Sequence, residues 1–159
     1  MSILRDQYKL IQDARQIMLQ FVSELQPADF VKGIDDFGNK SIRDTLVHVA
    51  HAYEFWMRQF SLKLPANFVE ANLIPTAQDV ITLYATVDER VASFIETFQS
   101  DLNQRIYGEN PQIALFKELS VLTLFTHVIT HEAHHKGQIM TMGRMLGYTP
   151  PDAAVIFGN

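Results

Sequence analysis

Residues 126–139 have the sequence THVITHEAHHKGQI, so four of the six histidines fall within one short segment. The segment lies inside a longer stretch, residues 117–146, in which apolar residues recur at the spacing of an α-helix. Gly147 follows this stretch, and two prolines come soon after it, as is typical of a helix end. We therefore predict one long helix, from about Lys117 to Leu146, that carries most of the histidines.

Three earlier segments show the same periodicity, and they predict helices over Ser2–Leu25, Ser41–Phe60 and Thr76–Gln99. Ser41 and Thr76 each precede an aspartate by three positions, which favours an N-cap at both residues. No alternating strand pattern competes with these helices. Residues 100–117 fit either a short extended piece or a single helical turn, because they contain Gly108 and Pro111.

Four amphipathic helices of more than four turns each predict an all-α fold, a four-helix bundle. The three connections are long, roughly 15 residues each, which permits crossovers as well as hairpins. The sequence contains no repeat, low-complexity tract or domain boundary. We predict a single domain over residues 1–159, a length that can bury a sizeable core without disulfides.

The composition excludes several classes of protein. With no cysteine, the chain has no disulfide, cysteine nucleophile or thiolate ligand, so a metal site must use His, Asp, Glu or water. The net charge is -5 and the basic residues do not cluster, which argues against nucleic acid as a partner. No apolar run approaches the roughly 20 residues that span a bilayer, and the first residues are too polar for a signal peptide. We expect a cytoplasmic protein that does not insert into a membrane.

The histidines of the last helix share one face, because successive residues advance by about 100°. The stripe consists of His127, His131, His134 and His135. Glu132 and Lys136 lie on a different side, four residues apart, as a solvent-exposed ion pair would. We therefore expect the histidine stripe to face the interior of the bundle, where imidazoles need polar partners. One divalent metal ion, such as Zn, Ni or Fe, would satisfy several of them.

His131 and His135 are four residues apart, so imidazoles from successive turns can meet one cation. The pairs His127/His131 and His131/His134 also fit, and periodicity does not choose among them. His48 and His51, on the second predicted helix, are the candidates for a third ligand.

The apolar stripe of that second helix consists of Ile42, Leu46, Val49, Tyr53, Trp56 and Phe60. His51 falls nearly opposite this stripe, whereas His48 lies roughly 120° from its centre. Periodicity therefore favours His48 as the third ligand, on a flank of the bundle where a site would open into a cleft.

A competing interpretation comes from residues 131–135, HEAHH, which match the HExxH motif of zinc proteases. In that motif the glutamate, here Glu132, activates a zinc-bound water. The extended form of the motif would place glycine at 138 and histidine at 141, where this chain has Gln138 and Thr141. The protease is therefore the weakest of the functional alternatives.

Residues 126–139 as a whole resemble the closing motif of the DinB/YfiT-like superfamily of bacterial metal-binding helical proteins. Residues 46–56, LVHVAHAYEFW, resemble its first motif, and residues 147–152, GYTPPD, resemble its ending. Thr130 stands where asparagine is common in the superfamily, and Lys136 stands where arginine is common. Neither departure removes a ligand.

The resemblance implies an up-down-down-up four-helix bundle, often a homodimer, with one divalent cation bound by three histidines. Carried over, His48, His131 and His135 are the metal ligands, and His134 is a common histidine that does not ligate. Relatives include thiol-dependent S-transferases and isomerases. The implied function is metal-dependent transfer or hydrolysis on a small molecule, with a low-molecular-weight thiol as a partner. The alternative is a non-catalytic metal-binding or stress-response bundle.

Overall fold

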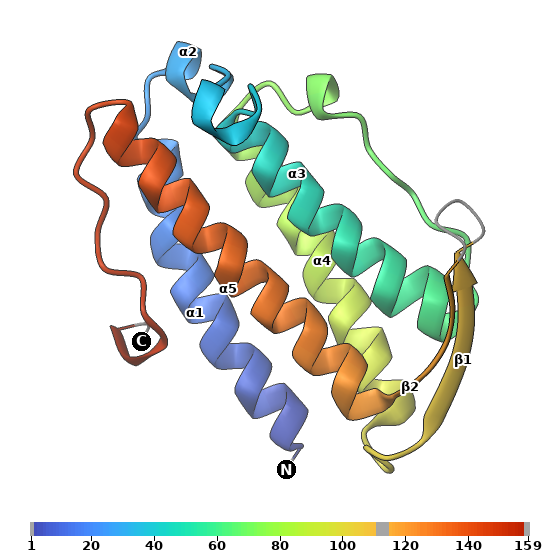
Figure 1. The fold of residues 1–159 in the computed structure, drawn as a ribbon. Coiled ribbons are helices and arrows are strands. Elements are labelled where there is room, and N and C mark those ends of the chain that lie inside the picture. The colour runs from blue at the N-terminus through green and yellow to red at the C-terminus, as the bar shows by residue number, and fades with distance from the viewer. Residues whose placement is uncertain (1, 111–114, 158–159) are drawn as a thin grey trace.

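The computed structural model describes residues 2–110 and 115–157, in which four long helices dominate (Figure 1). They are α1 (Ile3–Ser23), α3 (Ile42–Tyr53), α4 (Ala77–Phe98) and α5 (Val121–Met145). α3 packs against both α4 and α5, and α1 packs against the same two helices. The four helices therefore surround a common core, and the fold is mainly helical, as the periodicity predicts.

Shorter elements fill the connections. A short helix, α2 (Pro27–Phe30), and a 3-10 turn, Asp35–Phe37, follow α1; another 3-10 turn, Ala71–Leu73, precedes α4. Residues 63–70 have no regular secondary structure and lead back along the outside of α3 towards the start of α4 (Figure 1). A last 3-10 turn, Val155–Phe157, packs against α1.

Side-chain caps start two helices at the predicted residues. The Ser41 hydroxyl accepts a hydrogen bond from the Asp44 N–H at 3.1 Å, and Asp44 accepts one from the Ser41 N–H at 3.0 Å. Thr76 and Asp79 form the same reciprocal pair, at 3.2 and 3.0 Å. Both predicted N-caps are confirmed, because each pair satisfies backbone donors that lack a partner in the first turn of a helix.

The predicted start of the last helix at Lys117 is wrong. Lys117 lies in strand β2 (Leu115–Ser120), which pairs in antiparallel register with strand β1 (Arg105–Asn110). The helix α5 begins only at Val121, after the Ser120 side chain accepts a hydrogen bond from the Thr123 N–H at 3.1 Å. The extended piece, one of the two alternatives for this interval, is thus the one that forms, as a hairpin.

Strand β1 contains a glycine, Gly108, because it passes close to Phe60, the last residue of the π-helical segment Glu54–Phe60 that follows α3. A Cβ atom added to Gly108 would lie 2.4 Å from the ring of Phe60. Ile106, on the same face of β1, is only 6% exposed, whereas Tyr107 on the opposite face is 57% exposed. Gly108 is therefore a packing residue of a strand. Pro111, the other residue that suggested a turn here, lies outside the described residues.

A π-helical segment, Glu54–Phe60, extends α3 and shifts its apolar face. Met57 is fully buried, whereas Trp56 of the predicted apolar stripe is only half-buried. The Trp56 ring instead packs edge-on against His127, with 5.0 Å between the ring centroids. The wider helical turn therefore places an aromatic side chain beside the histidines of α5.

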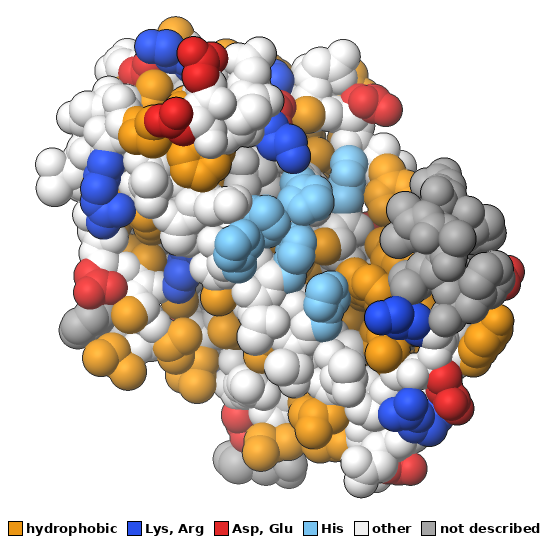
Figure 2. All heavy atoms as spheres, viewed as in Figure 1, with side chains coloured by type: hydrophobic (Ala, Val, Ile, Leu, Met, Phe, Trp, Pro, Cys, Tyr) orange, Lys and Arg blue, Asp and Glu red, His pale blue; other side chains and the backbone are white. Residues whose placement is uncertain are grey.

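The prediction that the histidine stripe faces the core and that Glu132 forms a surface ion pair is wrong. Glu132 is 3% exposed and lies on the buried face of α5, and Arg15 of α1 is equally buried. Lys136 does not pair with Glu132 and instead donates a hydrogen bond to the Ala153 carbonyl. Because Glu132 points inward, the histidines lie on the outer side of α5, and Figure 2 shows them at the surface.

Arg15 and Glu132 form the centre of a buried polar network that joins all four long helices. Arg15 donates two hydrogen bonds to the Glu132 carboxylate, at 2.7 and 2.8 Å, and a third to Asp88 of α4 at 2.6 Å. The Tyr53 hydroxyl of α3 donates to Glu132 at 2.5 Å, and the Tyr8 hydroxyl of α1 donates to Asp88 at 2.7 Å. Such bidentate, charge-assisted pairs combine strength with defined geometry, so the network fixes how the helices align.

Among the described residues, none of the helices is both long and apolar enough to span a bilayer. This finding agrees with the absence of long apolar runs in the sequence.

Removing one partner of the buried ion pair tests its contribution to stability. Arg15→Met leaves the Glu132 carboxylate buried without its cation, so we expect the free energy of unfolding to fall by about 3–5 kcal/mol. Urea denaturation at pH 7 measures this change. Lys9→Met is the matched control, because Lys9 also lies on α1 but pairs with Asp13 at the surface, and it should cost less than about 1 kcal/mol. Equal losses for the two variants would contradict the central role of the network.

Candidate metal centre

Two neighbouring helices bring three of the predicted ligands together. His48 lies on α3, and His131 and His135 lie on α5, which packs against α3. One ring nitrogen of each histidine lies within 4.8 Å of the other two. In Figure 2 the histidine side chains form a patch on one face of the molecule. His48 is exposed and the other two are half-buried, so the group is accessible from solvent.

The spacing of the ring nitrogens fits a small cation. The Nε2 atoms of His131 and His135 are 3.2 Å apart. Two nitrogens bound to a tetrahedral zinc at 2.0–2.1 Å would be separated by about 3.3 Å. The ring centroids of His48 lie 5.2 Å from His131 and 4.8 Å from His135, so the third ring faces both members of the pair. Three imidazoles in this arrangement fit one divalent cation of the Zn, Ni or Fe type.

A neighbouring amide orients one of the three rings. Gln138 Oε1 lies 2.7 Å from His135 Nδ1, and Gln138 Nε2 lies 3.2 Å from His134 Nε2. The amide oxygen can only accept a hydrogen bond, so the Nδ1 of His135 carries a proton and donates it. The lone pair of the neutral His135 ring is then on Nε2, the atom that faces His131. This is the orientation that a metal-binding histidine requires.

The three rings are held in the neutral form that binds metal. Burial, which is the largest cause, and the neighbouring His135 and His48 together lower the pKa of His131 to about 4. Burial is also the largest cause that lowers the pKa of His48 and of His135. Because imidazoles must be deprotonated to ligate, little proton competition is expected at neutral pH.

One atom of the cluster lacks a partner. His131 Nδ1 is buried and forms no hydrogen bond within the described part of the chain. Buried polar atoms of this kind are usually satisfied by an ordered water or an ion. One of the proposed ligands therefore has a buried ring nitrogen without a hydrogen-bond partner among the described residues.

The remaining histidines take other positions. His127 lies at 5.9 Å from His131 between ring centroids, compared with 4.4 Å between His131 and His135. His134 is exposed and bonded to Gln138. His51 Nε2 lies 2.9 Å from the Val69 carbonyl oxygen and takes no part in the cluster. Of the three helical pairs open to the sequence, the one that faces His48 is His131 with His135.

The geometry argues against the HExxH interpretation. Both Glu132 carboxylate oxygens accept hydrogen bonds from Arg15, and one of them also accepts from Tyr53. Glu132 is buried among these partners, whereas His131 and His135 are half-buried and lie beside His48 of α3. Its carboxylate is therefore a structural group of the core, and it does not face the position where a metal-bound water would be activated.

Sequence reasoning missed four residues that support the site, namely Arg15, Tyr53, Asp88 and Gln138. The buried position of Arg15 could have been predicted from the sequence. It follows Leu4, Tyr8 and Ile11 at the alternating spacing of four and three residues that is typical of the buried face of a helix. A charge at such a position needs a buried partner of opposite charge. Its partner Glu132 lies 117 residues later in the chain, and no comparable pattern around Glu132 predicts that it is buried.

Comparison with known families agrees with the motifs. A family model described as DinB family matches residues 1–157, nearly the whole chain. No curated protein matches the sequence. The chain therefore belongs to the DinB family.

Metal analysis of protein purified without a histidine tag should find about one equivalent of divalent cation per chain. We expect His131→Ala, His135→Ala and His48→Ala each to abolish stoichiometric binding, because each removes one of three ligands. His51→Ala and His134→Ala are matched controls on the same two helices and should retain the metal. Full occupancy in His48→Ala would show that the third ligand is assigned wrongly.

The amide of Gln138 offers a finer test of the same centre. Gln138→Leu removes the acceptor that orients His135, and we expect about 10–100-fold weaker metal affinity in a chelator competition assay. Gln138→Glu preserves an acceptor and should bind at least as tightly as the natural chain. Unchanged affinity in Gln138→Leu would mean that the hydrogen bond to His135 does not position a ligand.

Proposed function

We propose that this DinB-family chain binds one divalent cation through His48, His131 and His135 and uses it for transfer or hydrolysis on a small molecule. The observation that carries the proposal is the convergence of three neutral imidazoles at a solvent-accessible point between α3 and α5. Structural metal sites are usually closed by four protein ligands, whereas catalytic sites keep a position open. Three exposed or half-buried histidines are typical of a catalytic site with an open position.

A bound dication would act as a Lewis acid there and lower the pKa of a water or a thiol. The neighbouring side chains would bind and orient the substrate. Trp56 offers an apolar surface, and His127, packed edge-on against it, offers an imidazole outside the ligand set that can accept a substrate proton. Because the protein has no cysteine, a thiol in the reaction must come from a second substrate, and the family resemblance favours a low-molecular-weight thiol.

The resemblance also supports three broader proposals. They are an up-down-down-up order of the four helices, a homodimer and a cytoplasmic location. The long return of residues 63–70 along α3 is the kind of connection that such a helix order needs (Figure 1).

The proposal is tested by assaying zinc-, nickel- and iron-loaded protein with a panel of low-molecular-weight thiols and electrophilic acceptors. We expect turnover with at least one pair, stimulated by metal and lost in His131→Ala. His127→Ala should lower kcat while metal content stays at one equivalent, because His127 lies outside the ligand set. His134→Ala, at an exposed position on the same helix, is the matched control.

Absence of turnover across the panel, with stoichiometric metal binding intact, would favour the alternative function. The chain would then be a non-catalytic metal-binding or stress-response protein. Turnover that persists in His131→Ala would instead contradict the proposed metal centre as its source.

A further inference from the structure

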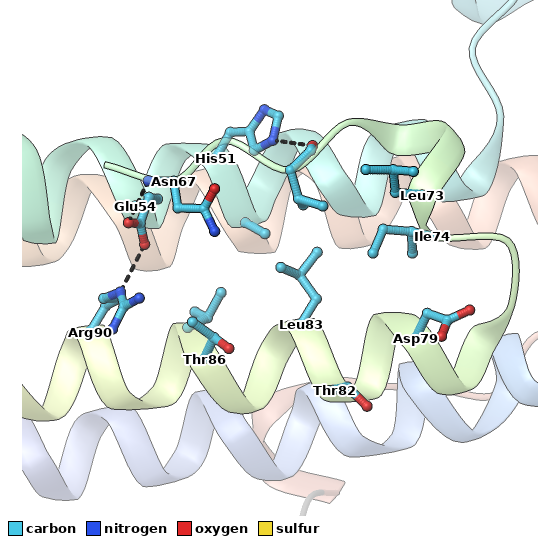
Figure 3. Close-up of a pocket in the computed structure, with 13 residues that line it drawn as sticks. His51, Glu54, Asn67, Leu73, Ile74, Asp79, Thr82, Leu83, Thr86 and Arg90 are labelled. Atoms are coloured by element: carbon cyan, nitrogen blue, oxygen red, sulfur yellow. Dashed lines mark hydrogen bonds and ion pairs between the residues drawn. The ribbon is translucent and has the colours of Figure 1, made fainter. Parts of the chain in front are cut away.

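A separate cavity of about 260 Å³ lies between α3, α4 and the segment that connects them (Figure 3). Its walls include Glu54 at the end of α3, Arg90 and Leu83 on α4, and Asn67 and Ile74 in the connecting segment. None of the three proposed metal ligands lines it. The cavity is therefore distinct from the metal centre.

Three hydrogen bonds hold the segment over the cavity to α3 and to the π-helical segment that extends it, although residues 63–70 have no regular secondary structure. His51 Nε2 lies 2.9 Å from the Val69 carbonyl oxygen, and the Asn67 N–H donates to Glu54 Oε1 at 2.9 Å. Arg58 donates to the Pro65 carbonyl at 2.8 Å. These side chains hold the segment in place above the cavity, so the hollow beneath it is a defined part of the fold.

One end of the cavity is polar, and the charged residues that line it there are Glu54 and Arg90. Glu54 is 6% exposed, and its two oxygens accept from the Asn67 N–H and from Arg90 Nε, the latter at 2.8 Å. Arg58 Nε lies 3.5 Å from the same carboxylate. Two guanidinium groups thus face one buried carboxylate, whose oxygens are already engaged.

Arg90 retains unused donors at this end. Its terminal Nη atoms form no hydrogen bond within the described residues, and the nearest other acid, Glu89, is 3.9 Å away with a side chain that is 74% exposed. A long contact to so exposed a carboxylate contributes little. In Figure 3 the Asn67 amide lies on the same side of the cavity as Arg90. These groups could bind a planar anion such as a carboxylate.

The other end of the cavity is mainly apolar. Asp79 also lines it (Figure 3), and its carboxylate accepts hydrogen bonds from the backbone N–H and the hydroxyl of Thr76. In Figure 3 the Leu83 side chain points from α4 towards the connecting segment, where Ile74 and Leu73 lie. Ala50 and Val87 complete this part of the lining. Ligand pockets typically measure about 300–1,000 Å³, so a cavity slightly below this range suits a small molecule of roughly six carbons.

We propose that this cavity binds a small carboxylic acid with a short aliphatic tail. The carboxylate lies against the terminal nitrogens of Arg90, and the tail lies between Leu83 and Ile74. An amine of the same size fits less well at the polar end, because both oxygens of Glu54 already accept hydrogen bonds and Arg90 would repel a cation. At the other end, Asp79 already accepts two hydrogen bonds from Thr76.

The test is an NMR titration of the metal-loaded, isotope-labelled protein with sodium hexanoate, with hexylamine and hexanamide as comparison ligands. We expect saturable shifts of the Asn67, Ile74 and Leu83 amide signals with a Kd on the order of 1 mM, and weaker binding of both comparison ligands. Arg90→Lys preserves the charge but loses the planar fork, and should weaken hexanoate binding about tenfold.

Leu83→Trp fills the apolar end and should also weaken binding at least tenfold. Ile81→Trp is its matched control, because Ile81 lies on the same helix, is 38% exposed and does not line the cavity. His131→Ala should bind hexanoate as well as the natural protein, which separates this site from carboxylate binding at the metal. Tighter binding of hexylamine, absence of saturable shifts, or full affinity in Arg90→Lys or in a folded Leu83→Trp would each overturn the proposal.

Discussion

The ion pair between Arg15 and Glu132 is the constraint on which the rest of the structure depends. A carboxylate and a guanidinium in the core are tolerated only if their geometry neutralises both charges and fills their hydrogen-bonding capacity. Here the bidentate pair meets that condition and adds Asp88 and Tyr53 as further partners. Because Glu132 is adjacent to His131 on α5, turning the carboxylate inward turns the histidine stripe outward. Tyr53 attaches α3, which carries His48, to the same carboxylate.

The parts of the fold that could be predicted from sequence are those set by local interactions. Ser41 and Thr76 start their helices through partners three residues away, so their short motifs suffice. The hairpin of β1 and β2 depends instead on pairing between two segments, one of which contains a glycine that also resembles a turn residue. The packing of Gly108 against Phe60, 48 positions earlier in the chain, is what makes that glycine part of a strand.

In the candidate site, too, the features set within one helix could be predicted from the sequence, whereas those set by contacts between helices could not. Helical geometry gives the relative angles of the histidines on α5, and these hold in the structure. It does not tell which side of the helix is buried. A charged residue usually marks the surface, whereas Glu132 is a buried charge with a partner on α1. At the level of sequence, only the family motif favours His131 with His135 over the other pairs. In the structure this pair is selected because His48 of α3 lies beside both rings. The spacing of residues within α5 carries no information about the position of α3.

The helix α3 takes part in both proposed sites. His48 lies next to α5, whereas Ala50, and Glu54 just after the end of α3, line the cavity beside α4. This is possible because α3 packs against both helices. Any influence of a ligand in the cavity on the metal centre would have to pass through a movement of α3. The 2.5 Å hydrogen bond from Tyr53 to Glu132 opposes such a movement, because shifting α3 would leave a buried carboxylate with one fewer donor. The core network therefore favours two sites that bind independently, although they share a helix.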